Sequence, residues 1–308
     1  VYELFLKSIK AESYNNAYEI LINIENVPKI DEYLSKDFSK IKTLLNHIHS
    51  EKAIEIIKKY NYQEKLDINE KINFYFNIYM NECNLKVSRS NILNNSIKYF
   101  NDICMKNKRI TINFINESGT DAGGISREWY TLVSESIIKS NVFISVPNGT
   151  TLTINPKNSN NDILKFTGQL IGSAFINKRY INMKLTSFIW KKLLEEEITL
   201  EDMKEYDNEI YQSLKWISEN DPEPLMMTFV DGDNIELCEG GLDKDLTEEN
   251  KEEFIRLMIE KKLIQPNLNS IELIKYGFQE VIDLNLISIF DSAEVREIIN
   301  GNETIDLD

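Results

Sequence analysis

The most reactive side chains in this sequence belong to three cysteines and two histidines. A cysteine beside a histidine can act as a nucleophile, and clusters of the two residue types can bind zinc. Cys83, Cys104 and Cys238 lack C-x-x-C spacing, so we expect buried structural thiols rather than a zinc or redox site. His47 and His49 point to different faces of a predicted helix, and we expect them at the surface. The sequence therefore predicts no catalytic triad, no metal and no cofactor.

A second segment that could carry chemistry is Thr120–Tyr130, which reads TDAGGISREWY. It follows alternating apolar residues at 110–114, typical of a half-buried strand, and leads into a helical pattern with Ser126 as the expected N-cap. Gly123 and Gly124 permit backbone angles that other residues avoid. A helix N-terminus can bind phosphate, but neither G-x-G-x-x-G nor Gly-Lys-Ser/Thr is present. We therefore expect a structural corner here.

The charge is concentrated in one part of the chain. The net charge is −15, and residues 195–253 hold 21 Asp and Glu against 4 Lys and no Arg. This excess of carboxylates argues against nucleic acid as a partner. Two interpretations of the acidic segment remain open: a solvated face that maintains solubility, or a docking surface that attracts a basic partner.

The bulk composition is that of a globular protein with more than one subdomain. The chain has 308 residues, of which 42% are hydrophobic and 28% charged. The apolar runs are too short for a membrane span, and no signal sequence opens the chain. The odd cysteine count favours a reducing cytoplasmic or nuclear location. Because the first residue is Val1 rather than Met, we expect a piece cut from a longer protein.

The first ~100 residues carry apolar side chains at helical spacing, which predicts a series of amphipathic helices. The four series are Leu4, Phe5, Ile9, Tyr18, Leu21 and Ile22; Ile41, Leu44, Leu45 and Ile48; Ala53, Ile54, Ile56 and Ile57; and Ile72, Phe74, Tyr75, Ile78 and Tyr79.

The middle of the chain predicts further elements. A helix is expected after Ser90 as N-cap, and an extended segment at Thr153–Pro156. Phe166–Phe175 predicts a helix in which Gly168 and Gly172 would let a neighbouring backbone approach.

Three elements are predicted in and around the acidic segment. Tyr206–Glu219 has the periodicity of a helix. Leu225–Phe229 and Ile235–Cys238 predict a hairpin. Leu246–Phe254 predicts a helix start with Thr247 as N-cap.

In their order and spacing, these segments resemble the HECT family of ubiquitin ligases. The resemblance covers residues 85–308 through five motifs, none of which is specific alone. The position where the family often has arginine is Gln169 here. The five motifs are Leu85–Ser96, Thr120–Tyr130, Phe166–Phe175, Leu246–Phe254 and Leu286–Gly301.

Within the family, the sequence looks most similar to the very large helical-repeat ligases. This narrower likeness rests on Arg127–Tyr130, Thr153–Pro156 and Leu286–Phe290.

The resemblance implies an α+β fold that is mainly helical. It would consist of a large helical subdomain, short strands or hairpins, and a small inserted subdomain that binds a partner. The expected boundaries are an N-terminal helical segment at 1–84, the large subdomain at 85–194 and 254–308, and the small subdomain at 195–253.

The resemblance also implies a function. The family accepts ubiquitin as a thioester from a conjugating enzyme on a cysteine in a separate C-terminal lobe, and then transfers it to a substrate lysine. None of the three cysteines here has the family's Thr-Cys-Phe context, and the chain ends at Ile305–Asp308, where the hinge between lobes would begin. We therefore expect this chain to dock the charged conjugating enzyme and to be inactive alone, with substrates bound by regions outside it. The alternative is a non-catalytic scaffold that retains the lobe.

The family's docking groove falls on six apolar positions of this sequence. Phe254 is the expected exposed anchor, because aromatic side chains in pockets contribute most to binding energy. For Ile210 and Leu214, a place in the core of the small subdomain is the open alternative. The six positions are Ile210, Leu214, Leu225, Met227, Phe254 and Met258.

Overall fold

The computed structural model describes residues 2–23, 34, 38–76, 81–117, 121–147, 149–158 and 160–301. Within them the fold is α+β and mainly helical, with two two-stranded sheets, as the sequence predicts. Some residues used above lie outside this set, namely Ile78, Tyr79, Thr120 and Ile305–Asp308. None of the helices in the described ranges is both long and apolar enough to cross a membrane.

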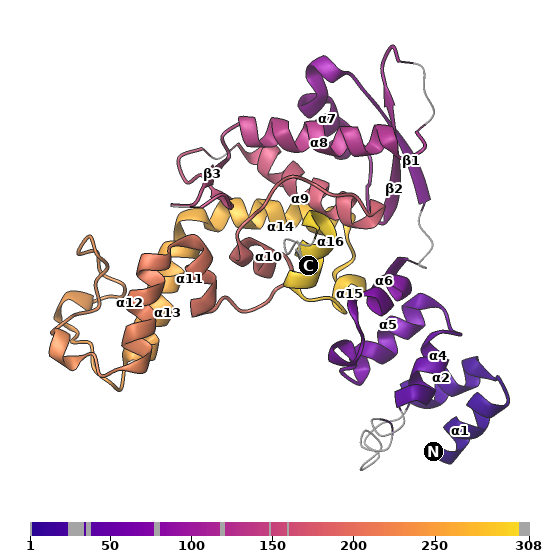
Figure 1. The fold of residues 1–308 in the computed structure, drawn as a ribbon, viewed down its shortest axis with the longest axis horizontal. Coiled ribbons are helices and arrows are strands. Elements are labelled where there is room, and N and C mark those ends of the chain that lie inside the picture. Colours follow the sequence, from indigo (N-terminus) through magenta and orange to yellow (C-terminus); the bar gives the residue numbers. More distant parts are fainter. Residues whose placement is uncertain are drawn as a thin grey trace, which may run out of the picture.

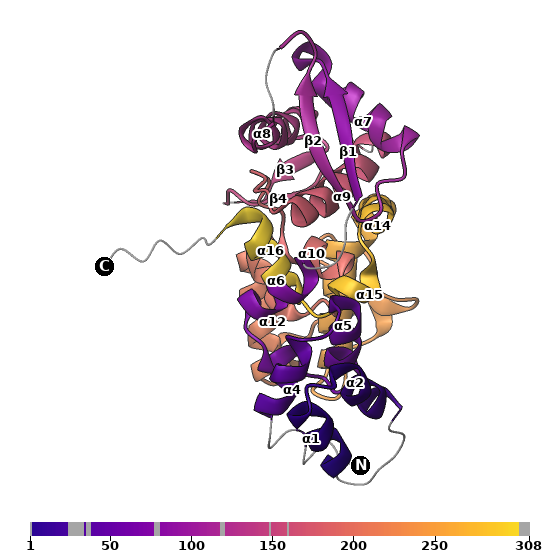
Figure 2. The ribbon, with the colours of Figure 1, turned by 90° about the vertical axis from the view of Figure 1, so that its right-hand side faces the viewer.

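The N-terminal segment is a group of short helices (Figure 2). Apolar residues every three or four positions give each helix a buried face, as Ile54 and Ile57 do in α5. At the end of α6, the rings of Tyr75 and Phe76 lie 5.1 and 5.5 Å from that of Phe175, which joins the segment to the rest of the core. The helices are α1 (Tyr2–Lys10), α2 (Tyr14–Ile22), α4 (Phe38–Leu45), α5 (Ser50–Lys59) and α6 (Ile68–Phe76).

A parallel strand pair follows. β1 (Asn81–Val87) pairs with β2 (Lys108–Phe114), and α7 (Ile92–Asp102) connects them. Alternate residues of β2 are buried, which confirms the predicted half-buried strand. β1 is an addition to the predicted elements. The N-cap of α7 is Asn91 rather than Ser90, because one turn of 3₁₀ helix precedes it.

The Gly-Gly corner differs from the prediction at its cap. Helix α8 (Gly124–Lys139) begins two residues before Ser126, after Gly123 with a φ of +101°. The side chain of Asp121 takes the capping role: its carboxylate accepts hydrogen bonds from the backbone N–H groups of Gly123 (2.9 Å) and Ser126 (3.2 Å) and from the Ser126 hydroxyl. It also accepts one from the N–H of Ile112 in β2 (2.9 Å), so one carboxylate joins strand to helix.

Two helices cross at glycines in the centre of the molecule. A Cβ at Gly168 of α9 (Asn161–Asn177) would lie 1.8 Å from the carbonyl oxygen of Ile274 in α14 (Leu268–Val281). This confirms the predicted close approach of a neighbouring backbone at Gly168. At the family's arginine position, the buried Gln169 donates to Glu280 of α14 (2.7 Å).

The remaining elements of the large subdomain surround these two helices (Figure 1). β3 and β4 form an antiparallel pair, and β4 confirms the extended segment predicted near Thr153. The elements are β3 (Phe143–Ser145), β4 (Leu152–Ile154), α10 (Ser187–Leu193), α15 (Leu284–Ile287) and α16 (Ser292–Asn300).

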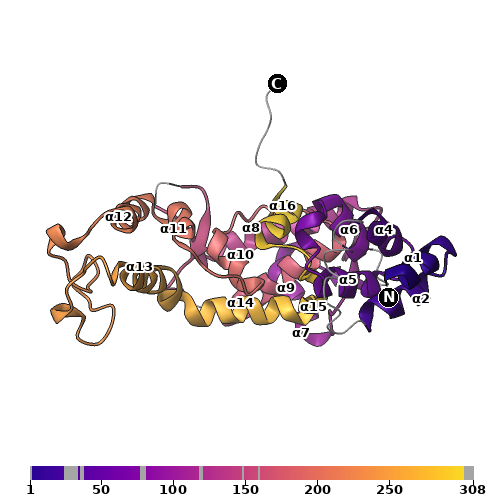
Figure 3. The ribbon, with the colours of Figure 1, turned by 90° about the horizontal axis from the view of Figure 1, so that it is seen from below.

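Three helices and the loops between them gather at one end of the molecule, opposite the N-terminal helices (Figure 1 and Figure 3). They are α11 (Leu200–Tyr206), α12 (Asn208–Glu219) and α13 (Lys251–Ile259). A π-helical turn at Glu260–Ile264 and a 3₁₀ turn at Gln265–Asn267 connect α13 to α14. The expected boundary after residue 253 falls inside α13, so we propose residues 199–264 as the small subdomain.

Candidate functional site

The small subdomain is built around the apolar face of α12. Asp207 caps this helix by accepting from the N–H groups of Glu209 (3.0 Å) and Ile210 (3.1 Å). From that start, Ile210, Leu214 and Ile217 fall on one side of the helix, as the periodicity predicts. This face looks toward the loop and the helix that follow.

The loop after α12 is held by backbone bonds rather than by a regular hairpin. Single bridges join Thr228 to Asp245 and Val230 to Glu236, so the predicted strands are not formed. Part of that stretch is instead a 3₁₀ turn, Glu223–Leu225. Pro224 lies within this turn, and its fixed φ suits the 3₁₀ conformation.

The buried side chain of Asp231 holds the tip of this loop through hydrogen bonds to the backbone. Its carboxylate accepts from the N–H groups of Asp233 and Ile235, both at 3.0 Å, and lies 3.4 Å from the ammonium of Lys262. Burial alone would raise the pKa of Asp231. The hydrogen bonds from Ile235 and Asp233 and the charge of Lys262 outweigh that effect and hold the pKa below its usual value.

Helix α13 closes the other side, and it begins later than predicted. Its N-cap is Asn250, so the first helical residue is Lys251. Thr247, the expected cap, instead donates its N–H to the Asn250 side chain (2.8 Å) in a preceding turn. The delay places Phe254 in the first turn of the helix, facing the loop.

A groove of about 650 Å³ lies between α12, the loop and α13. Five of the six predicted positions line it. The open alternative, a place in the core, holds for Leu214, which is buried and also lines the groove, whereas Ile210 is half-buried. The lining residues are Glu209, Ile210, Ser213, Leu214, Ile217, Met226, Met227, Thr228, Val230, Asp231, Gly232, Asn234, Phe254, Met258 and Lys262.

Leu225 is the predicted position that the structure does not bring to the groove. It ends the 3₁₀ turn with 45% of its surface exposed and is not among the lining residues. Met226, which the sequence reasoning missed, takes a place in the lining instead. In a strand, Leu225 and Met227 would have faced the groove together and Met226 would have faced away. The 3₁₀ turn breaks this alternation, so Met226 reaches the groove and Leu225 does not.

Phe254 corrects the prediction of an exposed anchor. Only 1% of its surface is exposed, and its ring packs edge-to-face on Phe229 with centroids 5.4 Å apart. The ring lines the bottom of the groove while filling the core of the small subdomain. The Phe254 side chain therefore contributes mainly to the stability of the small subdomain.

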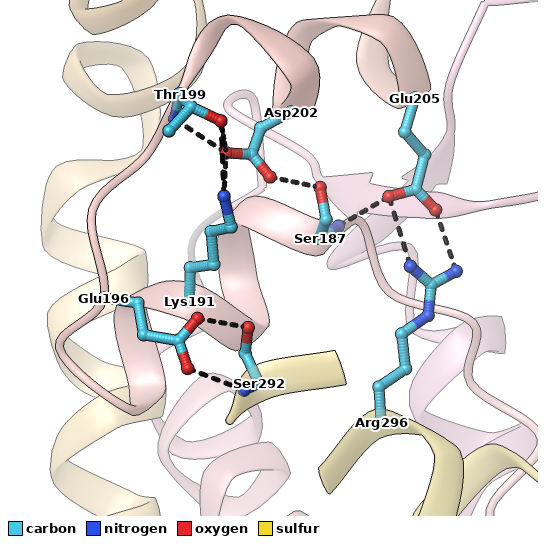
Figure 4. Close-up of polar contacts among 8 residues, drawn as sticks. All are labelled: Ser187, Lys191, Glu196, Thr199, Asp202, Glu205, Ser292 and Arg296. Atoms are coloured by element: carbon cyan, nitrogen blue, oxygen red, sulfur yellow. Dashed lines mark hydrogen bonds and ion pairs between the residues drawn. The ribbon is translucent and has the colours of Figure 1, made fainter. Parts of the chain in front are cut away.

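The carboxylates of the acidic segment divide into two groups. Three near its beginning turn inward: Glu196, Asp202 and Glu205. Asp202 of α11 accepts from the Ser187 hydroxyl (2.7 Å), the Lys191 ammonium (2.7 Å) and the Thr199 N–H (2.8 Å) (Figure 4). Asp202 is buried, so each of these partners compensates for lost hydration.

Glu205 shares Ser187 with this network, and Glu196 lies beside it (Figure 4). Glu205 pairs with both terminal nitrogens of Arg296 in α16, at 2.9 and 3.3 Å, and accepts from the Ser187 N–H. Glu196 accepts from the N–H and hydroxyl of Ser292, both at 2.6 Å. The contacts of Glu205 join the base of the small subdomain to the large one, and those of Glu196 hold the segment before α11 against α16.

The second group of carboxylates faces solvent on the small subdomain. Twelve acidic residues between 207 and 253 are exposed, and we call them the acidic surface. They are Glu209, Glu219, Asp221, Glu223, Asp233, Glu236, Glu239, Asp243, Asp245, Glu248, Glu249 and Glu252.

The reactive side chains are not assembled into a catalytic site. No group of three or more His, Cys, Asp or Glu within the described ranges could hold a metal ion. Cys104 is exposed, and Cys83 and Cys238 are half-buried, so the expectation of three buried thiols is wrong. Cys83 lies in β1, and its partial burial raises the pKa of its thiol. Both histidines are exposed, as predicted.

Comparison with known proteins identifies relatives for most of the chain. Residues 131–308 match the family described as HECT-domain (ubiquitin-transferase). An E3 ubiquitin-protein ligase TOM1-like of Neurospora crassa is 32% identical over 242 residues, which are 73% of this chain and 6% of that protein.

Two further relatives come from other fungi. E3 ubiquitin-protein ligase RSP5 of Emericella nidulans is 30% identical over 271 residues, covering 80% of this chain and 33% of that protein. E3 ubiquitin-protein ligase pub3 of Schizosaccharomyces pombe is 32% identical over 245 residues, covering 74% and 31%. The chain thus spans a third or less of the length of these three relatives.

Proposed function

Since this chain belongs to the HECT-domain family of ubiquitin transferases, we propose that its small subdomain docks a ubiquitin-conjugating enzyme. In the whole protein, the thiolate of a cysteine outside this chain attacks the thioester carbonyl of the ubiquitin that the enzyme carries. A new thioester forms, the conjugating enzyme leaves as a thiol, and ubiquitin then passes to a substrate lysine. Protein substrates bind through regions beyond this chain.

One observation carries the proposal: an apolar groove forms where five of the six positions given by the family resemblance meet. They come from α12, the following loop and α13, separated by up to 48 positions in the sequence, and reach one groove of about 650 Å³. Such concave apolar sites with a few polar groups at the rim are typical of specific binding. The groove would receive apolar side chains from a loop of the conjugating enzyme.

The groove residues divide between docking and support. Ile210 and Met227 are half-buried, so a partner can cover the part of each side chain that remains accessible. Leu214, Phe254 and Met258 are buried and form the base, whose shape they fix. The half-buried side chains thus provide contact area, and the buried ones keep the site formed in advance of binding.

The acidic surface would add attraction over a longer range. Its carboxylates lie on the same subdomain as the groove, and Glu209 belongs to both. A conjugating enzyme with basic residues around its docking loop would be drawn to this end of the molecule. The inward-turned carboxylates Asp202 and Glu205 take no part in this attraction, since they are neutralised inside the fold.

Isothermal titration calorimetry against a panel of purified conjugating enzymes tests the proposal. We expect saturable one-to-one binding by at least one of them, and a loss of about tenfold or more in affinity for Ile210→Asp, which places a charge in the groove. Leu4→Asp is the matched control, because Leu4 is 58% exposed in the N-terminal helix α1. Absence of binding to the whole panel, or equal affinity of Ile210→Asp and the unmodified chain, would contradict the proposal.

A further inference from the structure

Met226 combines two unusual properties. With 88% of its surface exposed, it is the most exposed large hydrophobic residue in the described part of the chain. Its backbone has φ of +50° and ψ of 40°, the left-handed region that side chains other than glycine and asparagine rarely adopt. A single exposed apolar residue needs no explanation. An explanation is required when the exposed apolar residue also has an unfavourable backbone conformation and lies at the mouth of a groove.

The conformation of Met226 is fixed from both sides. Its N–H donates to the carbonyl oxygen of Glu223 (3.0 Å), which closes the 3₁₀ turn that Pro224 stiffens. The next carbonyl, that of Met227, accepts from the N–H of Leu246 (2.8 Å). The left-handed turn therefore aims the Met226 side chain in a set direction, while the thioether itself remains free to change rotamer.

Packing within the fold does not account for this methionine. Glycine would adopt the same backbone angles with less strain, and a side chain so exposed contributes little to the core. The neighbouring Met227 and the more distant Met258 line the same groove. Three thioethers at one site give a surface that can adjust to differently shaped apolar groups and can contact aromatic rings through sulfur.

We infer that Met226 is a docking contact, which closes over the apolar loop residue that the conjugating enzyme inserts into the groove. The inference rests on the proposed function and adds a residue to it. It also specifies the partner: an enzyme whose docking loop carries an aromatic or long aliphatic side chain beside basic residues. The thioether gives the groove tolerance for both kinds of apolar side chain, and the left-handed backbone keeps the thioether at the entrance.

The test compares stability and affinity in variants of the 308-residue chain. Against the panel enzyme that binds the unmodified chain most tightly, we expect Met226→Gly to lose about tenfold in affinity by calorimetry. We expect its midpoint of thermal unfolding to be no lower than that of the unmodified chain, since glycine suits the backbone angles. Met226→Leu keeps an apolar side chain of similar volume and should retain affinity within about threefold.

Leu242→Ala is the matched control, because Leu242 is 55% exposed on the same subdomain and does not line the groove. Its affinity should stay within about twofold of the unmodified chain. If the unmodified chain binds and Met226→Gly binds equally well, the inference fails and the docking proposal stands. If the unmodified chain binds no enzyme of the panel, both fail. An affinity loss in Leu242→Ala equal to that in Met226→Gly would also overturn the role of Met226.

Discussion

At the scale of single residues, burial separates the groove positions that build the site from those that can meet a partner. Phe254 and Ile210 both line the groove, yet only the first is almost completely buried. A family resemblance can give the position of each, because it transfers place in the sequence. It cannot give exposure, which depends on where α13 starts and how Phe229 packs.

Phe254→Ala should consequently act on folding. Removing a buried aromatic ring leaves a cavity, and we expect a loss of about 3–5 kcal/mol in the free energy of unfolding, measured by urea denaturation. Ile235→Ala, at a 50% exposed position of the same subdomain, should change stability by about 0.5 kcal/mol or less. A Phe254→Ala variant as stable as this control would mean that the ring is not part of the core.

Asp231 gives the loop a dependence on pH. Its pKa is lower in the folded chain than in the unfolded chain, so the ionised form stabilises the fold above the unfolded pKa of about 3.9. This contribution is lost as the pH falls through the lower folded pKa. Asp231→Asn should therefore be less stable than the unmodified chain at pH 7, and the difference should narrow below about pH 4. Urea midpoints between pH 3 and 7 measure it, and a constant difference would contradict the role of the charge.

At the scale of elements, the helices were predictable from periodicity and their ends were not. The apolar spacing in α9 and α12 gives each helix and its buried face. The ends depend on side chains that contact backbone from outside the pattern, such as Asp121, which starts α8 two residues before Ser126. The 3₁₀ turn at Leu225, where a strand was predicted to begin, also depends on local geometry, because Pro224 lies within it.

Gly168 provides a test of how elements pack. An alanine Cβ there would lie 1.8 Å from the Ile274 carbonyl oxygen, so α9 and α14 would have to separate. We expect Gly168→Ala to lower the free energy of unfolding by about 1–3 kcal/mol or more. Gly124→Ala is the control, since a Cβ at that position meets nothing within 4 Å and should be close to neutral. Equal denaturation midpoints for the two variants would show that the helix crossing tolerates a methyl group.

At the scale of the whole molecule, the acidic segment holds carboxylates in two different settings, one inside the fold and one facing solvent. Asp202 and Glu205 attach the small subdomain to α10 and α16, whereas the twelve carboxylates of the acidic surface face outward. Composition reveals the total charge but not which carboxylates turn inward. That depends on partners distant in the sequence, such as Arg296, which is 91 positions away from Glu205. Neither interpretation left open by the sequence describes the inward carboxylates, which attach one subdomain to the other. For the outward carboxylates, attraction of a partner is our proposal and solubility is its alternative.

The outward carboxylates should accelerate association with a conjugating enzyme, and salt should remove that advantage. Because charges are screened over about 8 Å at physiological ionic strength, we expect the stopped-flow association rate constant to fall as salt rises, while the dissociation rate changes little. Replacing Glu239, Glu249 and Glu252 with glutamine should flatten the salt dependence. Neutralising three exposed acids of the N-terminal helices, Glu3, Glu12 and Glu51, removes the same charge at the opposite end of the molecule and should leave the slope nearly unchanged (Figure 3). An association rate that does not depend on salt, or equal slopes for the two triple variants, would leave the acidic surface with solubility as its only role.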